Sequence, residues 1–285
     1  MVTGMAAGTA TITAAQIESN VYASCVVTVI SIPATAVQLN KTNMAIETGK
    51  TDVLRATVLP EDATNKRVGW SSSNKSVAAV SGDGTVTAKA VGTAVITAST
   101  VNGKKASCTY RVLFSDVANL SDYFYEPVYW AVDNGITSGT SATTFSPYNS
   151  CTRGQVMSFL WKANGSPIVG GSNPFTDVKE SDYFYNAVLW AVSQGITSGT
   201  SATTFSPYNP CTRAQVMSFL YKAMGSPEVS SSNPFTDVKE SDYFYAPVLW
   251  AVSQGITNGT SATTFGPYNT CTRAQVMTFL YKAMN

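Results

Sequence analysis

A short stretch of the sequence occurs three times at one fixed spacing. It reads Cys-Thr-Arg-Gly-Gln at 151–155 and Cys-Thr-Arg-Ala-Gln at 211–215 and 271–275, so the copies begin 60 residues apart. Self-similarity at a fixed period indicates small repeated units that bury their apolar faces against one another. This repetition limits the possible folds of the chain more than any other feature.

Each copy has the pattern of a helix start. Val216, Phe219, Leu220 and Ala223 lie at i, i+3, i+4 and i+7, which is one apolar face of a helix. The preceding Thr-x-x-Gln is a capping box, in which the Thr oxygen and the Gln side chain each satisfy a free backbone N–H. The Thr and the Gln therefore need no functional explanation.

Arg213 is less easily explained. It occupies the first position of the predicted helix, where the partial positive charge of the helix end disfavours a cation. One explanation is an ion pair with a nearby carboxylate such as Asp177 or Asp237. The other is that Arg213 and the free N–H groups bind an external anion, a carboxylate or a phosphate. The two explanations do not exclude each other.

Composition excludes several classes of function. The 285 residues suggest about two domains, with a net charge of +1 and 12% charged residues, so nothing favours binding to nucleic acid or to a membrane. The sequence has no His, which removes Ser-His-Asp and Cys-His catalysis and the usual zinc sites. No apolar stretch is long enough to span a membrane. We expect no catalytic residues, no metal and no cofactor; paired acids occur only in threefold repeated positions, so the chain is not predicted to be an enzyme.

The first part of the chain is predicted to be all-β. Residues 31–113 alternate apolar and polar positions between turn signals such as Asn102-Gly103, which predicts an antiparallel β-sandwich with Trp70 as its core aromatic. Residues 1–30 repeat the last strands of that segment, for example 8–14 against 92–98. We therefore interpret residues 1–30 as the C-terminal part of a domain whose beginning is missing, and the chain as a fragment of a longer protein.

This segment is similar to a known family. The motifs Leu-Pro-Glu-Asp-Ala-Thr at 59–64, Val-Gly-Trp-Ser-Ser-Ser-Asn at 68–74 and Val-Gly-Thr-Ala at 91–94 resemble a bacterial immunoglobulin-like domain of group 2. The resemblance implies a stalk or spacer of a surface protein, sometimes an adhesive one. The absence of any evident pocket-forming motif favours a spacer.

Residues 114–285 hold three units, which we place at 114–170, 171–230 and 231–285. Each opens with Phe-x-Asp-Val, and a first helix then begins near Tyr125, Tyr185 or Tyr245. That helix ends at a Gly of the left-handed type, a polar loop follows, and the capped second helix closes the unit. Since one unit buries little surface, three units are expected to share a core as a compact pseudo-threefold body.

These units resemble the S-layer homology (SLH) module, which occurs in sets of three. The residues that carry the resemblance are Phe-x-Asp-Val, Trp-Ala-Val-x-x-Gly-Ile-Thr, Thr-Phe-x-Pro and Thr-Arg-Ala-Gln. The resemblance implies a three-pronged pseudo-trimer with a central helical bundle. It also implies non-covalent anchoring to the secondary polymers of bacterial cell walls, often through pyruvylated sugars, with glycan bound in the grooves between the prongs.

The site residues are carried over from the family motifs position by position. They are the motif arginines, the Phe-x-Asp-Val acids, the first-helix tryptophans and the loop glycines: Arg153, Arg213, Arg273, Asp116, Asp177, Asp237, Trp130, Trp190, Trp250, Gly139, Gly199 and Gly259. An Arg would bind the pyruvate carboxylate through charge-assisted hydrogen bonds. The tryptophans lie in apolar helices, so a core role and a sugar-contacting role both stay open.

Two departures from the family pattern stand out. The Glu of the family motif is Gln in all three copies, which keeps the capping box and removes a negative charge beside the Arg. The leading Ile is a Cys in each copy, and Gly154 replaces Ala in the first, which should weaken that helix start by up to about 1 kcal/mol. We interpret all five cysteines as small buried apolar residues, because Cys25 and Cys108 are one repeated position and the other three are another.

The sequence thus predicts a multidomain chain: an all-β Ig-like sandwich with a partial copy in front, then a mostly α pseudo-threefold trimer of helix-loop-helix units. The predicted function is anchoring of an extracellular surface protein to an anionic, pyruvylated secondary cell-wall polysaccharide. The partner is that polymer, and the chain is expected to be a monomer with an internal pseudo-trimer. The alternative is a surface adhesin that binds a glycan or protein of a host or neighbouring cell.

Overall fold

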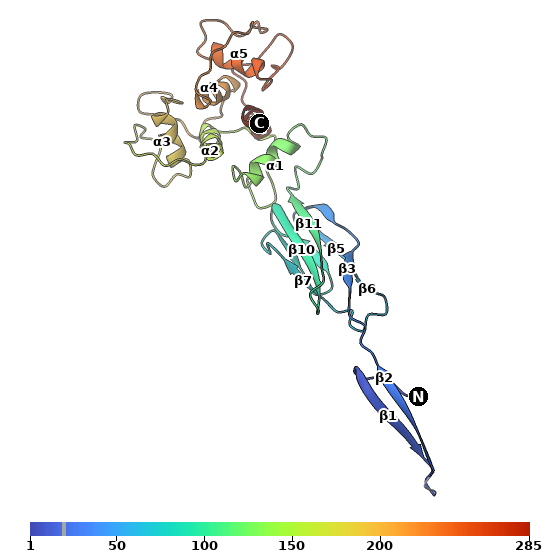
Figure 1. Ribbon diagram of the computed structural model, residues 1–285. Coiled ribbons are helices and arrows are strands. Elements are labelled where there is room, and N and C mark those ends of the chain that lie inside the picture. Colours follow the sequence, from blue (N-terminus) through green and yellow to red (C-terminus); the bar gives the residue numbers. More distant parts are fainter. Residues whose placement is uncertain (19–20) are drawn as a thin grey trace. The chain divides into compact units, whose positions relative to one another are not determined.

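The computed structural model describes residues 1–18 and 21–285 (Figure 1). The chain divides into two compact units, Met1–Val112 and Leu113–Asn285. The first unit consists of strands and the second of helices and loops.

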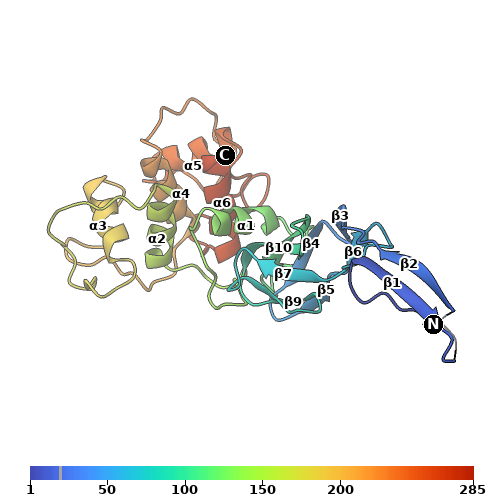
Figure 2. The same ribbon diagram turned by 60° about the horizontal axis from the view of Figure 1, so that its bottom comes forward.

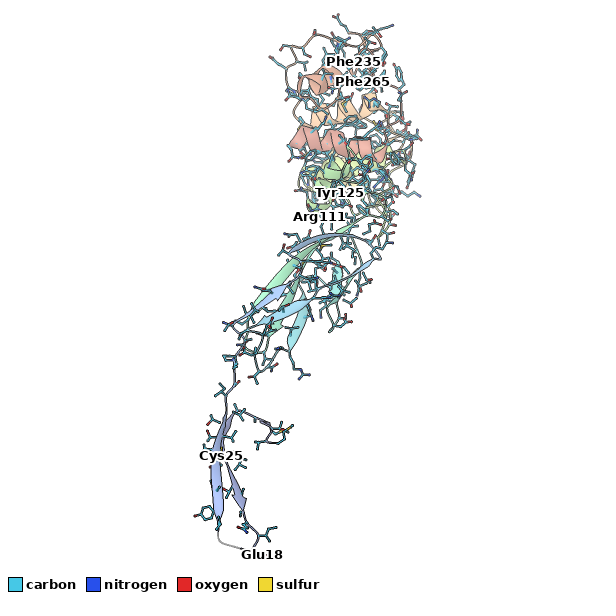
Figure 3. The ribbon with its side chains drawn as sticks, turned by 90° about the vertical axis from the view of Figure 1, so that its right-hand side faces the viewer. Glu18, Cys25, Arg111, Tyr125, Phe235 and Phe265 are labelled. Atoms are coloured by element: carbon cyan, nitrogen blue, oxygen red, sulfur yellow. The ribbon has the colours of Figure 1, made fainter. Side chains whose placement is uncertain are left out.

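The first unit begins with a hairpin of β1 (Gly8–Ala15) and β2 (Tyr22–Val29). Ile12 pairs with Cys25 across this hairpin, as Ile96 pairs with Cys108 in a later one, so the two hairpins share a register. Cys25 lies on β2 (Figure 3) and is exposed, like nearly all side chains of this hairpin. The interpretation of all five cysteines as buried is therefore wrong for Cys25, because no second layer covers either face of the hairpin in the described residues.

The remaining strands form the two faces of a small sandwich. A four-stranded sheet has the order β4-β11-β10-β7, and the opposite side consists of the pair β3-β6 and the three strands β5-β9-β8. The bounds are β3 (Ala36–Leu39), β4 (Asn43–Glu47), β5 (Thr51–Val53), β6 (Ala56–Leu59), β7 (Val68–Ser72), β8 (Ala78–Val80), β9 (Thr85–Ala88), β10 (Gly92–Thr100) and β11 (Lys105–Leu113).

The core of this sandwich is centred on Tyr110 rather than on the aromatic predicted from the sequence. Tyr110 is fully buried, whereas Trp70 is half-buried and packs against both apolar clusters of the domain. The Tyr110 hydroxyl donates to Asp52 Oδ2 at 2.7 Å, and Asp52 also pairs with Lys41. The phenol can be buried because its hydroxyl has this partner.

The second unit contains six helices in its described residues. The first helices of the three repeats are α1 (Tyr125–Asp133), α3 (Tyr185–Ser193) and α5 (Tyr245–Ser253), and the second helices are α2 (Arg153–Ala163), α4 (Arg213–Ala223) and α6 (Arg273–Met284). The predicted capping box forms at each second helix, through Thr152, Thr212 and Thr272. The first helices end, as predicted, just before glycines with φ near +67°, where the left-handed conformation stops the helix.

The helices pair between repeats rather than within them. The second helices α2, α4 and α6 lie at the centre, and the first helices lie outside them (Figures 1 and 2). α3 packs against α2, α5 against α4, and α1 against α6. Each first helix therefore rests on the second helix of the preceding repeat, and the last repeat closes onto the first.

A ring of backbone hydrogen bonds marks the centre of this closure. The Cys151 N–H donates to Cys271 O, that of Cys271 to Cys211 O, and that of Cys211 to Cys151 O, at 2.8–2.9 Å. The three cysteine side chains are fully buried beside the ring. Burial raises the pKa of the Cys151 thiol to about 12, so these thiols stay protonated apolar groups, as their positions predicted.

Candidate functional site

The Phe-x-Asp-Val acids hold the polar loop of their own repeat. Asp177 Oδ1 accepts from the Phe205 N–H at 2.8 Å and Oδ2 accepts from the Ser206 N–H at 2.7 Å. The corresponding pairs of bonds form at the other two acids, Asp116 and Asp237. Both carboxylate oxygens are thus engaged by backbone N–H groups, which bends the loop back over the repeat.

The loop held by this Asp covers the start of the second helix of the preceding repeat. The Arg153 N–H donates to Asn209 O at 3.0 Å and the Gly154 N–H to Pro207 O at 2.8 Å. The same two bonds form at α4, from the loop of the third repeat, and at α6, from the loop of the first repeat. The first N–H groups of these helices are therefore used between repeats and are not available to an external anion.

The arginine of each helix start is buried between aromatic rings. Arg153 is only 3% exposed, and its Nε donates to Phe205 O at 2.9 Å. Its guanidinium carbon lies 4.7 Å from the ring centre of Phe205 and 5.3 Å from that of Phe219. Burial lowers the pKa of Arg153 from its usual value. An arginine is nevertheless a cation at neutral pH.

Arg213 and Arg273 are held in the same way. Their Nε atoms donate to Phe265 O and Phe145 O, respectively. No ion pair joins Arg213 to Asp177 or Asp237 in the described part of the chain, since both oxygens of each Asp accept from the loop backbone. Arg213 bonds to a backbone carbonyl of the next repeat instead of a carboxylate.

The guanidinium groups retain unused donors. Nη2 of Arg153 and Nη2 of Arg273 are buried without a hydrogen-bond partner, whereas Nη2 of Arg213 donates weakly to Thr257 Oγ1 at 3.4 Å. A buried donor without an acceptor costs about 1–3 kcal/mol. An oxygen ligand that reached Nη2 would recover that cost, which is the part of the anion hypothesis that the geometry supports.

Arg153 lies at a groove of about 690 Å³ built by all three repeats. We call it the Arg153 groove. Repeat 2 supplies the loop 197–200 and one side of α4 with Phe219 and Lys222, and repeat 3 supplies Tyr243 and the start of α5. The groove therefore combines a cationic floor, hydroxyl groups and an exposed aromatic ring.

The loop glycines are required by the backbone. Gly139, Gly199 and Gly259 have φ of +89°, +88° and +84°, and a Cβ on Gly199 would come within 2.5 Å of the Phe175 ring. Gly199 also lines the Arg153 groove. In repeat 3 the equivalent Gly259 lies against the ring of Phe235. That ring packs against Phe265, with ring centroids 5.7 Å apart, and both residues are labelled in Figure 3.

The tryptophans pack between the helices. Trp190 and Trp250 are 6% and 5% exposed, and Trp130 is half-buried. Trp250 contacts the Tyr221 ring and Trp130 the Tyr281 ring, each from a first helix to the second helix on which it rests. The sequence left open a core role and a sugar-contacting role for the tryptophans, and these contacts are those of core residues. None of the three tryptophans is among the described lining residues of the Arg153 groove.

Sequence reasoning missed several groove residues. Tyr243 is 66% exposed, and Lys222 and Ser218 also line the groove. The available signal was repetition, because an exposed Tyr recurs at the same place of the Ser-Asp-Tyr-Phe-Tyr motif as Tyr123 and Tyr183. In the described residues, no three potential ligands are clustered as a metal site.

The sandwich and the closed ring of three helical repeats each match a known family of domains. Residues 33–110 match the bacterial Ig-like domain (group 2), and residues 113–157, 174–217 and 234–277 match the S-layer homology domain. The chain therefore consists of a group 2 Ig-like domain followed by three SLH repeats, and the predicted families and fold class are confirmed.

Curated relatives share these domains over part of their length. The surface-layer 125 kDa protein of Lysinibacillus sphaericus is 29% identical over 52% of this chain and 13% of its own length. An endoglucanase of Bacillus sp. (strain KSM-635) is 32% identical over 42% of this chain and 13% of its own length. The chain thus spans only a small part of these relatives, 21% at most among the first eight.

Among solved structures, the S-layer protein SbsC is 23% identical, with 40% of this chain and 18% of that chain covered at a TM-score of 0.28. SLH domains are typical of S-layer and other surface proteins anchored to the cell wall, so the predicted cell-surface location is confirmed. The matched modules are of non-catalytic, anchoring types. No described helix combines the length and the apolar character needed to cross a membrane.

Proposed function

We propose that the helical unit anchors the protein by binding an anionic secondary cell-wall polysaccharide, with pyruvylated sugars as the recognised residues. The observation that carries this proposal is the pair of buried arginines, Arg153 and Arg273, whose Nη2 donors have no acceptor. The carboxylate of a pyruvyl ketal would supply the oxygen that Nη2 lacks in a charge-assisted hydrogen bond.

The groove suits a sugar that carries such a group. Its floor is a cation held in place on three sides, by one carbonyl and two rings, so little side-chain entropy is lost when a ligand binds. The loop hydroxyls can bond to sugar hydroxyls, and Tyr243 offers a ring face for a pyranose. In this proposal the carried-over Asp and Gly residues shape the loops, the Trp residues pack the helices, and the arginines contact the ligand.

The Ig-like domain would serve as a stalk. Its described residues are a compact sandwich whose polar cluster, Lys41, Asp52 and Tyr110, is internally satisfied. The domain boundaries given above and the monomeric state stay predictions. Catalysis is not proposed for this chain, although relatives that share its modules include glycosidases.

The test is co-sedimentation of the full chain with purified Gram-positive cell walls, with and without chemical removal of the secondary polymer. Binding should disappear with the polymer, and Lys222→Ala in the groove should weaken it. Lys179→Ala, an exposed lysine outside the groove, is the matched control and should bind normally. Binding that persists without the polymer would refute the proposal and favour the adhesin.

A further inference from the structure

The three repeats share one register, so the Arg153 groove has two equivalent positions in the ring, around Arg213 and Arg273, and the three differ at the start of the first helix. Ala246, the second residue of α5, lines the Arg153 groove. The same position is Asn186 in α3 and Glu126 in α1, and both side chains are exposed. Because α1 rests on α6 as α5 rests on α4, Glu126 occupies the equivalent position beside Arg213, and Asn186 the one beside Arg273.

The arginine at the Glu126 position also differs from the other two. Nη2 of Arg213 has one weak contact, 3.4 Å to Thr257 Oγ1, while Nη2 of Arg153 and that of Arg273 have no partner. In the same groove Lys282, the counterpart of Lys222, donates its Nζ to Gly255 O at 3.1 Å. Lys282 is thus bonded to the protein, and Arg213 weakly so, at the position where a negative charge has been added.

We propose that the protein binds an anionic glycan at two of its three grooves, those of Arg153 and Arg273, and that Glu126 excludes it from the groove of Arg213. The inference rests on the function proposed above and assigns its specificity. Beside Arg153 and Arg273 a carboxylate-bearing sugar would approach a cation whose buried Nη2 has no acceptor. Beside Arg213 it would meet the Glu126 carboxylate, and like charges brought together across an interface disfavour binding.

Glu126 has a structural use that does not compete with this role. An acidic residue in the first turn of a helix interacts favourably with the helix dipole, but α3 and α5 form with Asn186 and Ala246 at the same position. The charge is therefore not needed for the helix. Exchanging these residues should change binding without unfolding the ring.

The buried arginines provide a separate signal for each groove. Each Nε–H is held by a carbonyl of the next repeat, so the three Nε–H groups should give resolved, slowly exchanging NMR signals in the ¹⁵N-labelled chain. The probe is the pyruvyl ketal of a methyl hexoside, and its methyl ester is the neutral control. Titration should shift the signals of Arg153 and Arg273, and that of Arg213 only at concentrations at least about tenfold higher.

Three variants make the test decisive. Glu126→Gln should bring Arg213 to the affinity of the other two, and Ala246→Glu should weaken binding at Arg153 by about tenfold or more. Glu240→Gln, an exposed acid outside the Arg153 groove, should change nothing. Equal shifts at all three arginines in the parent chain, with no effect of Glu126→Gln, would overturn the inference and leave the proposed function intact. If the ketal shifts none of the signals, or if the ester binds equally well, the proposed function itself fails.

Discussion

Replacing Asp177 by Asn should cost the helical unit much more stability than a surface change, because both carboxylate oxygens accept backbone N–H groups. Asn offers one acceptor oxygen and turns an NH₂ group toward the second N–H. One hydrogen bond to a charged group, worth about 1.5–3 kcal/mol, is lost, and a partly buried donor is left unpaired at a further cost of about 1–3 kcal/mol. Since Asp177 is only partly buried, we expect a loss of about 3 kcal/mol.

The assay is urea and thermal unfolding of the full chain followed by tryptophan fluorescence. Four of the five tryptophans, all but Trp70, lie in the helical unit, so the emission reports mainly on that unit. A loss of about 3 kcal/mol corresponds to a melting temperature lower by about 6–12 °C for a unit of this size. Glu180→Gln, an exposed acid of the same repeat, is the control. A change below about 0.5 kcal/mol for Asp177→Asn would refute the clamp, since surface substitutions fall within that range.

Three further predictions follow from single contacts. Tyr110→Phe should destabilise the sandwich by about 1–3 kcal/mol in urea unfolding. Burial opposes ionisation of Asp52, but the hydrogen bonds from Lys41 and Tyr110 outweigh it and lower the pKa of Asp52. The stability that this carboxylate contributes is therefore present above about pH 4 and lost as the pH falls further. Tyr110→Phe should make the stability of the sandwich less sensitive to acid, because it removes one of these hydrogen bonds. Gly154→Ala should fail to give the stabilisation of about 1 kcal/mol expected for an exposed helix, because the new Cβ would lie 2.9 Å from the Phe184 ring. A thiol reagent should modify Cys25 in the native chain and the buried cysteines only after denaturation.

Local structure could be predicted from the sequence wherever the partners are close in the chain. The capping box joins Thr212 to Gln215, three residues away, and the glycine that ends each first helix acts through its own backbone. The apolar period then shows which helix face is buried. These interactions need no knowledge of the rest of the fold, so the pattern predicted them correctly.

The role of the arginines could not be predicted in this way. Arg153 bonds to a carbonyl 52 residues ahead, and Arg273 to one 128 residues back. Every residue has a backbone carbonyl, so this partner cannot be recognised in the sequence. The carboxylates of Asp177 and Asp237 can be, and the sequence therefore suggests them as partners. The same limit explains Trp70 and Cys25, because burial depends on which elements cover a position and not on the residue type alone.

The closure of the ring determines how many repeats the Arg153 groove needs. The Arg153 groove takes its cation from the first repeat, its loop and one wall from the second, and its exposed tyrosine from the third. The cation is held by the loop of the second repeat, which is held in turn by Asp177 of that repeat. Because the same cyclic hydrogen bonds relate the three repeats, the equivalent positions around Arg213 and Arg273 also draw on all three. A chain with two such repeats would have no complete groove, which explains in physical terms why the repeated stretch occurs three times.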